Sequence, residues 1–352
     1  MQPSHRVLLA LVASFMVGLR SVACFSQGGL TTNLVAGKCS TGTLPRCGQH
    51  TVYKHANPLR CRSRLLFWQN LVCTEESGLE RRGGKSLHVY AFVTMVGWGK
   101  NTLLNELSSL DATSCKEHFG SSIPPVILES DEIGKDKFWP VVEKTIKDGD
   151  DDLDHLILNK NFPPNSWKGT VKRLKRVCEE KQRNLCIHAI FPKSVGSERN
   201  AFSLFDCATC LYSVKNRQEH PNLSSSANNI PEVVSLFYKL YHVPGGRKEF
   251  LNNLRNNFTE SVIEVDWIKS ECMVSTSQDL DRKMEKLFWV TRKINRAKKE
   301  NQNEIPDDLR SELDAVVVDI FDSQTNIQMF ETCRLEPSRV LQSFLENLPR
   351  ST

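Results

Sequence analysis

Two glycines and a lysine follow directly after an apolar run, in an order that suits phosphate binding. Gly97, Gly99 and Lys100 come after the apolar stretch Leu87–Met95 and before a helix-like segment. Glycines let backbone N–H groups face phosphate oxygens, a lysine reaches the β- and γ-phosphates, and a helix N-terminus adds the positive end of its dipole. The order therefore predicts a P-loop that binds ATP or GTP together with Mg²⁺.

This segment departs from the pattern G-x-x-x-x-G-K-[ST] at two positions. Thr94 stands where the first glycine belongs, and Asn101 stands where the hydroxyl that binds Mg²⁺ belongs. Thr102 carries a hydroxyl one residue later and is the weaker candidate for that metal contact. On the motif alone, an ordinary strand-turn-helix corner remains an alternative.

A carboxylate follows the next apolar segment of the chain. Val126–Leu128 reads as a short strand, and Glu129 and Asp131 come directly after it. A carboxylate on a loop that faces a P-loop is where a phosphoryl-transfer enzyme places the general base for an acceptor hydroxyl. Asp131 is the candidate base and Glu129 is the second choice. The alternative is that Asp131 only caps the following helix.

The elements that must position these residues alternate between strand-like and helix-like patterns. Residues 126–128, 156–158 and 185–191 read as strands, and residues 138–146 and 167–181 read as helices. Such alternation is typical of a parallel α/β sheet, whose site residues lie on loops at the carboxyl ends of the strands. The loop residues are then Glu129–Asp131, Asn159–Asn161 and Phe191–Lys193.

The second half of the chain reads as mainly helical. Apolar residues recur at helical spacing in 202–214, 233–241, 248–258, 309–321 and 337–348, and the charged stretch Arg292–Asp308 reads as a link. We expect a P-loop kinase-like α/β core over residues 75–200. Residues 201–352 are expected to form the helical remainder of that domain and a C-terminal extension.

The first 74 residues have the composition of a targeting leader. Residues 1–23 combine Arg6, an apolar run and small residues before residue 24, which predicts a secretory signal peptide. Residues 24–74 resemble a transit peptide, because residues 1–74 contain no Asp or Glu. This two-part leader resembles the address of proteins sent to a secondary plastid. Secretion or an endomembrane location is the alternative, and no membrane span is expected once the leader is removed.

The net charge and the number of cysteines are different when residues 1–74 are left out. The chain has 46 Lys and Arg against 41 Asp and Glu, but eight of the basic residues lie in the leader, which leaves three more acidic than basic residues. Net charge therefore gives no argument for nucleic-acid binding, and any such site must be a local patch. Seven of the 12 cysteines remain, and Cys207 and Cys210 read as core thiols rather than a metal or redox pair.

One local basic patch is expected on the helix at residues 167–181. Lys168, Lys172, Lys175 and Arg176 recur at helical spacing. Such a face is usually only solvated, but beside a nucleotide site it would suit a lid or an RNA phosphate chain.

Several segments together resemble the central polynucleotide-kinase domain of plant- and alga-type tRNA ligases. The segments are Glu129–Trp139, Asn159–Trp167, Arg199–Leu204, Phe237–Tyr241 and Arg247–Phe250. They occur in the family's order, and the resemblance runs from about Leu87 to Phe258. It implies a kinase that moves the γ-phosphate of an NTP, often GTP, to an RNA 5′-hydroxyl.

The resemblance assigns roles residue by residue. Lys100 is placed on the β- and γ-phosphates and Asp131 as the base toward the ribose hydroxyl, while Asn159 stands where the family has an aspartate. The residues expected to contact the nucleotide are Thr94, Gly97, Trp98, Gly99, Lys100, Asn101, Thr102, Asn159, Lys160 and Asn161. The expected partners are an RNA 5′-hydroxyl end and a separate ligase subunit, because the family's ligase and phosphodiesterase motifs are not found.

Three functions fit these features to different degrees. The leading hypothesis is an RNA 5′-hydroxyl kinase that acts in tRNA splicing or RNA repair. The departures at Thr94, Asn101 and Asn159 favour the alternative, a catalytically degenerate subunit that binds nucleotide or RNA. A small-metabolite P-loop kinase fits the order of the loops but not the segments similar to tRNA ligase.

Overall fold

The computed structural model describes residues 85–149, 152–217, 229–272, 278–300, 304–322 and 324–349. All of them belong to one compact unit, Gly78–Thr352. The signal peptide and transit-peptide leader predicted for residues 1–74 lie outside the described residues.

Five parallel strands form one sheet in the order β2-β3-β1-β4-β5. Their bounds are β1 Ser86–Phe92, β2 Val126–Glu129, β3 His155–Asn161, β4 Asn184–Pro192 and β5 Ser261–Val265. β1 is the central strand, with Tyr90 in register with Ile157 of β3 and His188 of β4. The predicted parallel α/β fold with a central strand before the glycine turn is therefore confirmed.

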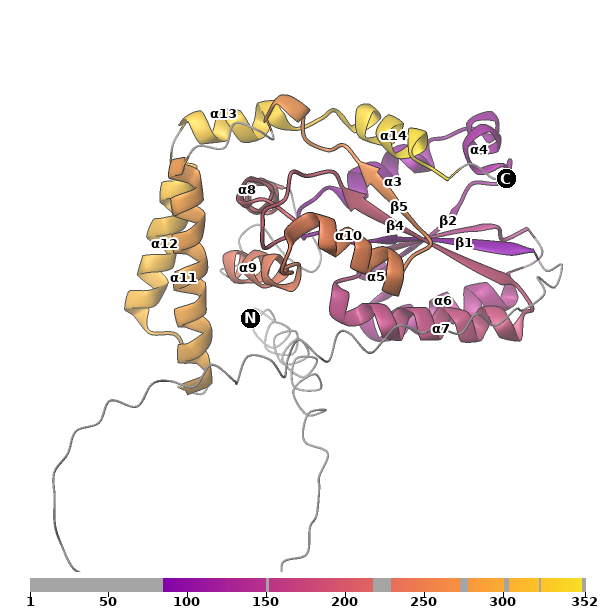
Figure 1. Ribbon diagram of the computed structural model, residues 1–352, viewed down its shortest axis with the longest axis horizontal. Helices are drawn as coiled ribbons and strands as arrows, with labels where there is room; N and C mark the ends of the chain where they lie inside the picture. Colours follow the sequence, from indigo (N-terminus) through magenta and orange to yellow (C-terminus); the bar gives the residue numbers. More distant parts are fainter. Residues whose placement is uncertain are drawn as a thin grey trace, which may run out of the picture. The chain divides into compact units, whose positions relative to one another are not determined.

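Helices cover both faces of the sheet (Figure 1). α6 and α7 lie side by side on one face, and α3 and α14 lie together on the other. The α-helices are α3 Lys100–Ser108, α4 Ala112–Phe119, α5 Ser130–Ile133, α6 Lys135–Asp148, α7 Trp167–Glu180, α8 Leu204–Lys215, α9 Ile230–Leu240, α10 Gly246–Asn257, α11 Gln278–Glu300, α12 Asp307–Phe321, α13 Gln324–Cys333 and α14 Pro337–Glu346. None of the helices in the described part of the chain combines the length and the apolarity that a bilayer crossing requires.

Local sequence explains where the helices begin. The Asp111 carboxylate accepts a hydrogen bond of 2.7 Å from the Ser114 backbone N–H and so caps α4. Ser203 and Asp206 form a reciprocal capping box at the start of α8. α7 buries Leu174 and its apolar neighbours against the sheet and leaves its lysines in solvent.

Three loops predicted at the strand ends are regular structure instead. Asn159–Asn161 belongs to β3, because Phe162 N–H donates to the Phe92 carbonyl and holds this stretch beside β1. Glu129 ends β2 and Asp131 lies in the short helix α5. Phe191 and Pro192 end β4 rather than starting a loop.

The second half of the chain also differs from the prediction in two places. The charged stretch that begins at Arg292 is not a link up to Glu300, because it forms the last part of α11. It is helical because Val290 and Ile294 give α11 a buried apolar side despite its charge. The region expected to be helical also contributes β5, whose Ile263 and Val265 are fully buried at one edge of the sheet.

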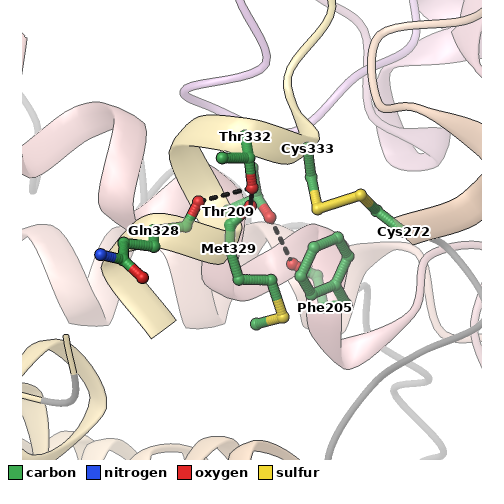
Figure 2. The surroundings of a disulfide bond; sticks show 7 residues. All are labelled: Phe205, Thr209, Cys272, Gln328, Met329, Thr332 and Cys333. Carbon is green, nitrogen blue, oxygen red and sulfur yellow. Dashed lines mark hydrogen bonds between the residues drawn. A yellow bond between two sulfur atoms is a disulfide. The ribbon is translucent and has the colours of Figure 1, made fainter. Parts of the chain in front are cut away.

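A disulfide joins Cys272 to Cys333 and was not foreseen from the sequence (Figure 2). Cys333 is the last residue of α13, and Cys272 ends the short 3₁₀ turn η4 (Ser270–Cys272). Cys207 and Cys210 are free and buried, as predicted for core thiols, and burial raises the pKa of both well above the ordinary value.

Candidate nucleotide-binding site

The P-loop turns sharply at its two glycines. Gly97 and Gly99 have φ angles of 82° and 101°, in the left-handed region that glycine adopts without strain. Lys100 is the first residue of α3, directly after Gly99 at its N-cap. A Cβ on Gly97 would lie 2.4 Å from the Cys210 carbonyl oxygen, so α8 packs on the loop where a side chain would not fit.

Thr94 is a structural residue at the start of this loop. It is fully buried, and its backbone carbonyl accepts a hydrogen bond of 2.8 Å from the hydroxyl of Tyr241. Its own hydroxyl donates to the Asn161 side-chain oxygen over 2.7 Å. Thr94 and Asn161, both expected to contact the nucleotide, therefore bind each other and fix the P-loop to β3.

Asn159 connects the P-loop to the carboxylate that ends β2. Its side-chain amide donates to Asn101 Oδ1 over 3.1 Å and to Glu129 Oε2 over 2.8 Å. Three residues from α3, β3 and β2 thus meet at the carboxyl edge of the sheet. Two of them, Asn101 and Asn159, are among the residues predicted to contact the nucleotide. In the described part of the chain, no cluster of three or more His, Cys, Asp or Glu has the geometry to hold a metal ion.

Lys100 lies in a charged cluster beside these amides. Burial lowers the pKa of Lys100 to about 8, the carboxylates of Asp131 and Glu129 act to raise it, and the Arg217 guanidinium lowers it further. Burial also lowers the pKa of Arg217, while Asp131 raises it. The structure therefore brings the predicted pair Lys100 and Asp131 into electrostatic contact and adds Arg217, which lies at the end of α8.

Lys160 lies away from the P-loop glycines, among aromatic side chains. Its ammonium stands 5.1 Å from the centre of the Phe138 ring and 5.9 Å from that of Trp139. Burial lowers the pKa of Lys160, and the nearby cations Lys135 and Arg173 lower it further. The Arg173 guanidinium lies 5.4 Å from the centre of the Trp139 ring. Lys160, Arg173 and the Trp139 ring together extend the predicted basic face of α7 toward β3.

That basic face is exposed, as expected for a solvated or RNA-facing helix surface. Lys168, Lys172, Lys175 and Arg176 all stand in solvent on α7. Arg176 pairs with Glu143 of α6 over 2.7 Å, while neither Lys168 nor Lys172 has an ion pair among the described residues. The half of the face nearest the start of α7 is therefore free to meet a phosphate chain.

Thr102 and Trp98 face a different cleft. Both line it together with Gly99, and the remaining walls come from Trp267 after β5 and from Arg334 after α13. Three side chains near the P-loop carry oxygens that could contact a metal ion. Those of Glu129 and Asn101 accept hydrogen bonds from Asn159, whereas the Thr102 hydroxyl lies near Gly99, as does the Arg334 guanidinium. The oxygens of Glu129 and Asn101 are of the kind that Mg²⁺ takes when a nucleotide supplies further oxygens. The metal contact predicted for Thr102 stays a prediction.

The later segments that resemble the tRNA ligases are scaffold rather than site. Asn200 accepts from the Phe202 N–H and donates to the Tyr238 carbonyl, which fixes the turn before α8. Asp206 is buried and accepts from both Ser194 and Ser203, and burial raises the pKa of its carboxyl. These residues hold the connection between β4 and α8, which in turn packs on the P-loop.

Arg217 and Arg334 are the charged site residues that the sequence did not reveal. Each follows a helix with no motif around it, and each reaches the P-loop only through the folding of the chain. Glu129 was only a second choice, but its hydrogen bond to Asn159 makes it a central member of the site.

Comparisons with known proteins give little further information. No family model matches this chain. No curated protein matches it either. Among solved structures, a fungal RNA kinase is 13% identical over 67% of this chain and 98% of its own, with a TM-score of 0.35. A match at that level carries no argument about function, which is therefore inferred from the site itself.

Proposed function

We propose that this protein binds a nucleoside triphosphate at the P-loop and transfers its γ-phosphate to the 5′-hydroxyl of an RNA end. The observation that supports this most is the cluster at the start of α3. Lys100 stands there at a helix N-terminus beside the carboxylate of Asp131 and the guanidinium of Arg217. Cations and a helix N-terminus bind the phosphates, and a carboxylate next to them suits a general base.

In the proposed reaction, Asp131 accepts the proton of the RNA 5′-hydroxyl as its oxygen attacks the γ-phosphorus. A new O–P bond forms, the bond between the γ-phosphorus and the β,γ-bridging oxygen breaks, and the nucleoside diphosphate leaves. Lys100 and Arg217 stabilise the negative charge on the phosphoryl oxygens. Mg²⁺, held through Glu129 and Asn101, would supply further positive charge when bound with the nucleotide.

The acceptor RNA is proposed to approach along the start of α7. Lys160 and Arg173 flank the indole of Trp139, and Lys168 and Lys172 continue the positive surface. Cations next to an aromatic ring suit single-stranded RNA, because they bind phosphates while the ring stacks on a base.

A second candidate function is a catalytically inactive subunit that binds nucleotide or RNA. It is favoured by the amides of Asn101 and Asn159, which hydrogen-bond to each other where P-loop enzymes place a hydroxyl and a carboxylate. With the charge of one carboxylate absent, the site holds Mg²⁺ less strongly.

Phosphate transfer from γ-labelled ATP and GTP to 5′-hydroxyl RNA distinguishes the two functions. For a kinase, Asp131→Asn should lower turnover roughly 10²- to 10⁴-fold at nearly unchanged nucleotide affinity. Lys100→Ala should lower both, and Lys144→Ala on α6 is the control for losing an ordinary lysine. Nucleotide binding with no transfer by the wild-type protein would instead support the inactive subunit.

A further inference from the structure

A small cleft opens beside the P-loop, on the side of Gly99 and Thr102. One wall is Trp98 and these two P-loop residues. The opposite wall comes from distant parts of the chain, namely Trp267, Arg334, Leu335 and Val340. The cleft therefore joins the P-loop to the C-terminal part of the chain.

The polar side chains around this cleft include three with unused hydrogen-bond donors. Trp98 and Trp267 are 3% and 4% exposed, and neither indole Nε1–H has a hydrogen-bond partner among the described residues. A buried donor without a partner destabilises the folded protein, and each of these indole nitrogens has almost no accessible surface of its own. Arg334 likewise has no ion pair or hydrogen bond from its guanidinium within the described structure. A guanidinium donates and does not accept, so a ligand of Arg334 must be rich in acceptors.

Arg334 is held at the P-loop by several bonds. Its Nη2 lies 3.8 Å from where a Cβ on Gly99 would be, and Thr102 Oγ1 lies 3.9 Å from the same point. A β-bridge joins Arg334 to Ile268, and on either side of it Leu335 N–H donates to the Trp267 carbonyl over 3.0 Å and Lys269 N–H to the Cys333 carbonyl over 2.8 Å.

The disulfide fixes the same segment covalently. Cys333 immediately precedes Arg334, and Figure 2 shows its bond to Cys272 at the end of α13, above the α8 residues Phe205 and Thr209. The link joins two positions 61 apart in the sequence, and α11, α12 and α13 lie between Cys272 and the end of that stretch at Cys333. Packing also holds this segment, because Phe330 of α13 is fully buried against Phe205 and Tyr212 and the Tyr212 hydroxyl donates to Glu331 over 2.6 Å. The disulfide is therefore the covalent restraint on Arg334 among several restraints.

We propose that Arg334 binds the α-phosphate end of the nucleotide, and that the Cys272–Cys333 disulfide helps to hold Arg334 in place for this contact. The inference rests on the proposed nucleotide site. Lys100 and its charged neighbours serve the β- and γ-phosphates, and Thr102, two residues further along α3, turns toward Arg334. Phosphate oxygens are acceptors, and they meet the helix N-terminus and the guanidinium together.

Nucleotide affinity tests the role of Arg334 in the full chain under oxidising conditions. Arg334→Gln should weaken binding of GTP and of GMP roughly 10- to 100-fold, since a hydrogen bond to a charged group contributes about 1.5–3 kcal/mol. Arg334→Lys should recover part of the loss. Arg339→Gln removes an exposed arginine from α14 and is the matched control, expected to bind as the wild type does.

A second measurement compares two ligands, beginning with the wild-type protein. GMP should bind the wild-type protein more tightly than guanosine does, and Arg334→Gln should remove most of that difference while leaving guanosine binding unchanged. Equal binding of GMP and guanosine by the wild type would overturn the proposal.

Reduction tests the role of the disulfide. Dithiothreitol supplies two electrons and two protons, so that the disulfide becomes two cysteine thiols and the reagent becomes a cyclic disulfide. Reduced wild type and the double variant Cys272→Ser, Cys333→Ser should bind GTP about as weakly as Arg334→Gln. Reduction of Arg334→Gln should cause no further loss, because both changes remove the same contact.

The outcomes separate this inference from the proposed function. If the wild type binds GTP and loses affinity through Lys100→Ala but not through Arg334→Gln, the P-loop site stands and the role of Arg334 is wrong. If Arg334→Gln weakens binding but reduction does not, the contact stands and the disulfide is not what holds it. If the wild type binds no nucleotide, both proposals fail.

Discussion

Two groups of polar residues lie on the same sheet and use their hydrogen-bonding capacity differently. In the first, three histidines cross the central strands and bond within the protein. His88 Nδ1 lies 2.8 Å from His188 Nε2, His188 Nδ1 lies 2.7 Å from the Ser261 hydroxyl, and His155 Nδ1 lies 3.2 Å from the Tyr90 hydroxyl. We call these three residues, His88, His155 and His188, the histidine row.

The second group surrounds the P-loop and keeps part of its capacity unused. The indole donors of Trp98 and Trp267 are buried without partners among the described residues, and Lys100 is a cation in a largely buried position. A buried polar group without a hydrogen-bond partner destabilises the folded protein, so its presence calls for an explanation, and a role in function is one such explanation. This difference supports a structural role for the histidine row and agrees with the binding role that we propose for the P-loop residues, although both groups contain titratable side chains.

The largest expected effect concerns the histidine row at acid pH. Burial lowers the pKa of His155 and of His188 to about 4, whereas both titrate near 6.5 in the unfolded chain. The unfolded state therefore binds more protons between these values, and stability falls as the pH drops from about 6.5 toward 4. The expected slope is about 1.4 kcal/mol per pH unit for each histidine, measured by urea unfolding at pH 7, 6 and 5.

Variants identify the groups responsible for that slope. His188→Gln should reduce it by roughly a third to a half, because one of the three rings whose pKa is lowered by burial is removed from the row. His242→Gln changes an exposed histidine and is expected to leave the slope unchanged. If the full slope persists in His188→Gln, groups outside the histidine row cause the loss of stability at acid pH.

A smaller effect is expected where α8 packs on the P-loop. A methyl group added to Gly97 would lie 2.4 Å from the Cys210 carbonyl and 2.7 Å from the Val214 side chain, at a positive φ angle. Gly97→Ala should therefore lower the free energy of unfolding by about 2–3 kcal/mol and weaken GTP binding.

Gly169 provides the matched control for this change. It lies within α7 with no atom within 4 Å of an added Cβ, so Gly169→Ala should stabilise the protein by about 0.5–1 kcal/mol. Equal effects of the two substitutions on thermal unfolding would show that α8 does not constrain the P-loop.

The sequence was sufficient for the parts of the fold that depend on short-range pattern. The apolar run before Gly97, the lysine after Gly99 and the alternation downstream predicted the central strand, the start of α3 and the parallel sheet. These features follow from local periodicity and from the conformational needs of glycine, which are visible in neighbouring residues.

The parts that could not be predicted depend on contacts between distant residues. Cys272 and Cys333 are separated by 61 positions, and nothing near either one indicates its partner. β5 is only five residues long, and Arg334 reaches Gly99 only because the bridge to Ile268 places it there. Lys160 was expected on a loop after a strand at residues 156–158, but β3 continues to Asn161, and the Lys160 ammonium lies near the rings of Phe138 and Trp139.

The smallest expected effect tests the P-loop side of the comparison at alkaline pH. Burial lowers the pKa of Lys100 to about 8, and only the protonated amine attracts the β- and γ-phosphates. GTP affinity should therefore be constant near pH 7 and should fall above about pH 8, by at most about tenfold per pH unit, or about 1.4 kcal/mol. In Lys100→Arg, whose guanidinium stays charged, the decline should be absent up to pH 9.5. If the wild type shows the same flat profile, Lys100 does not bind phosphate as a cation. The P-loop cluster would then be a structural element of the sheet, like the histidine row, and the difference between the two groups would disappear.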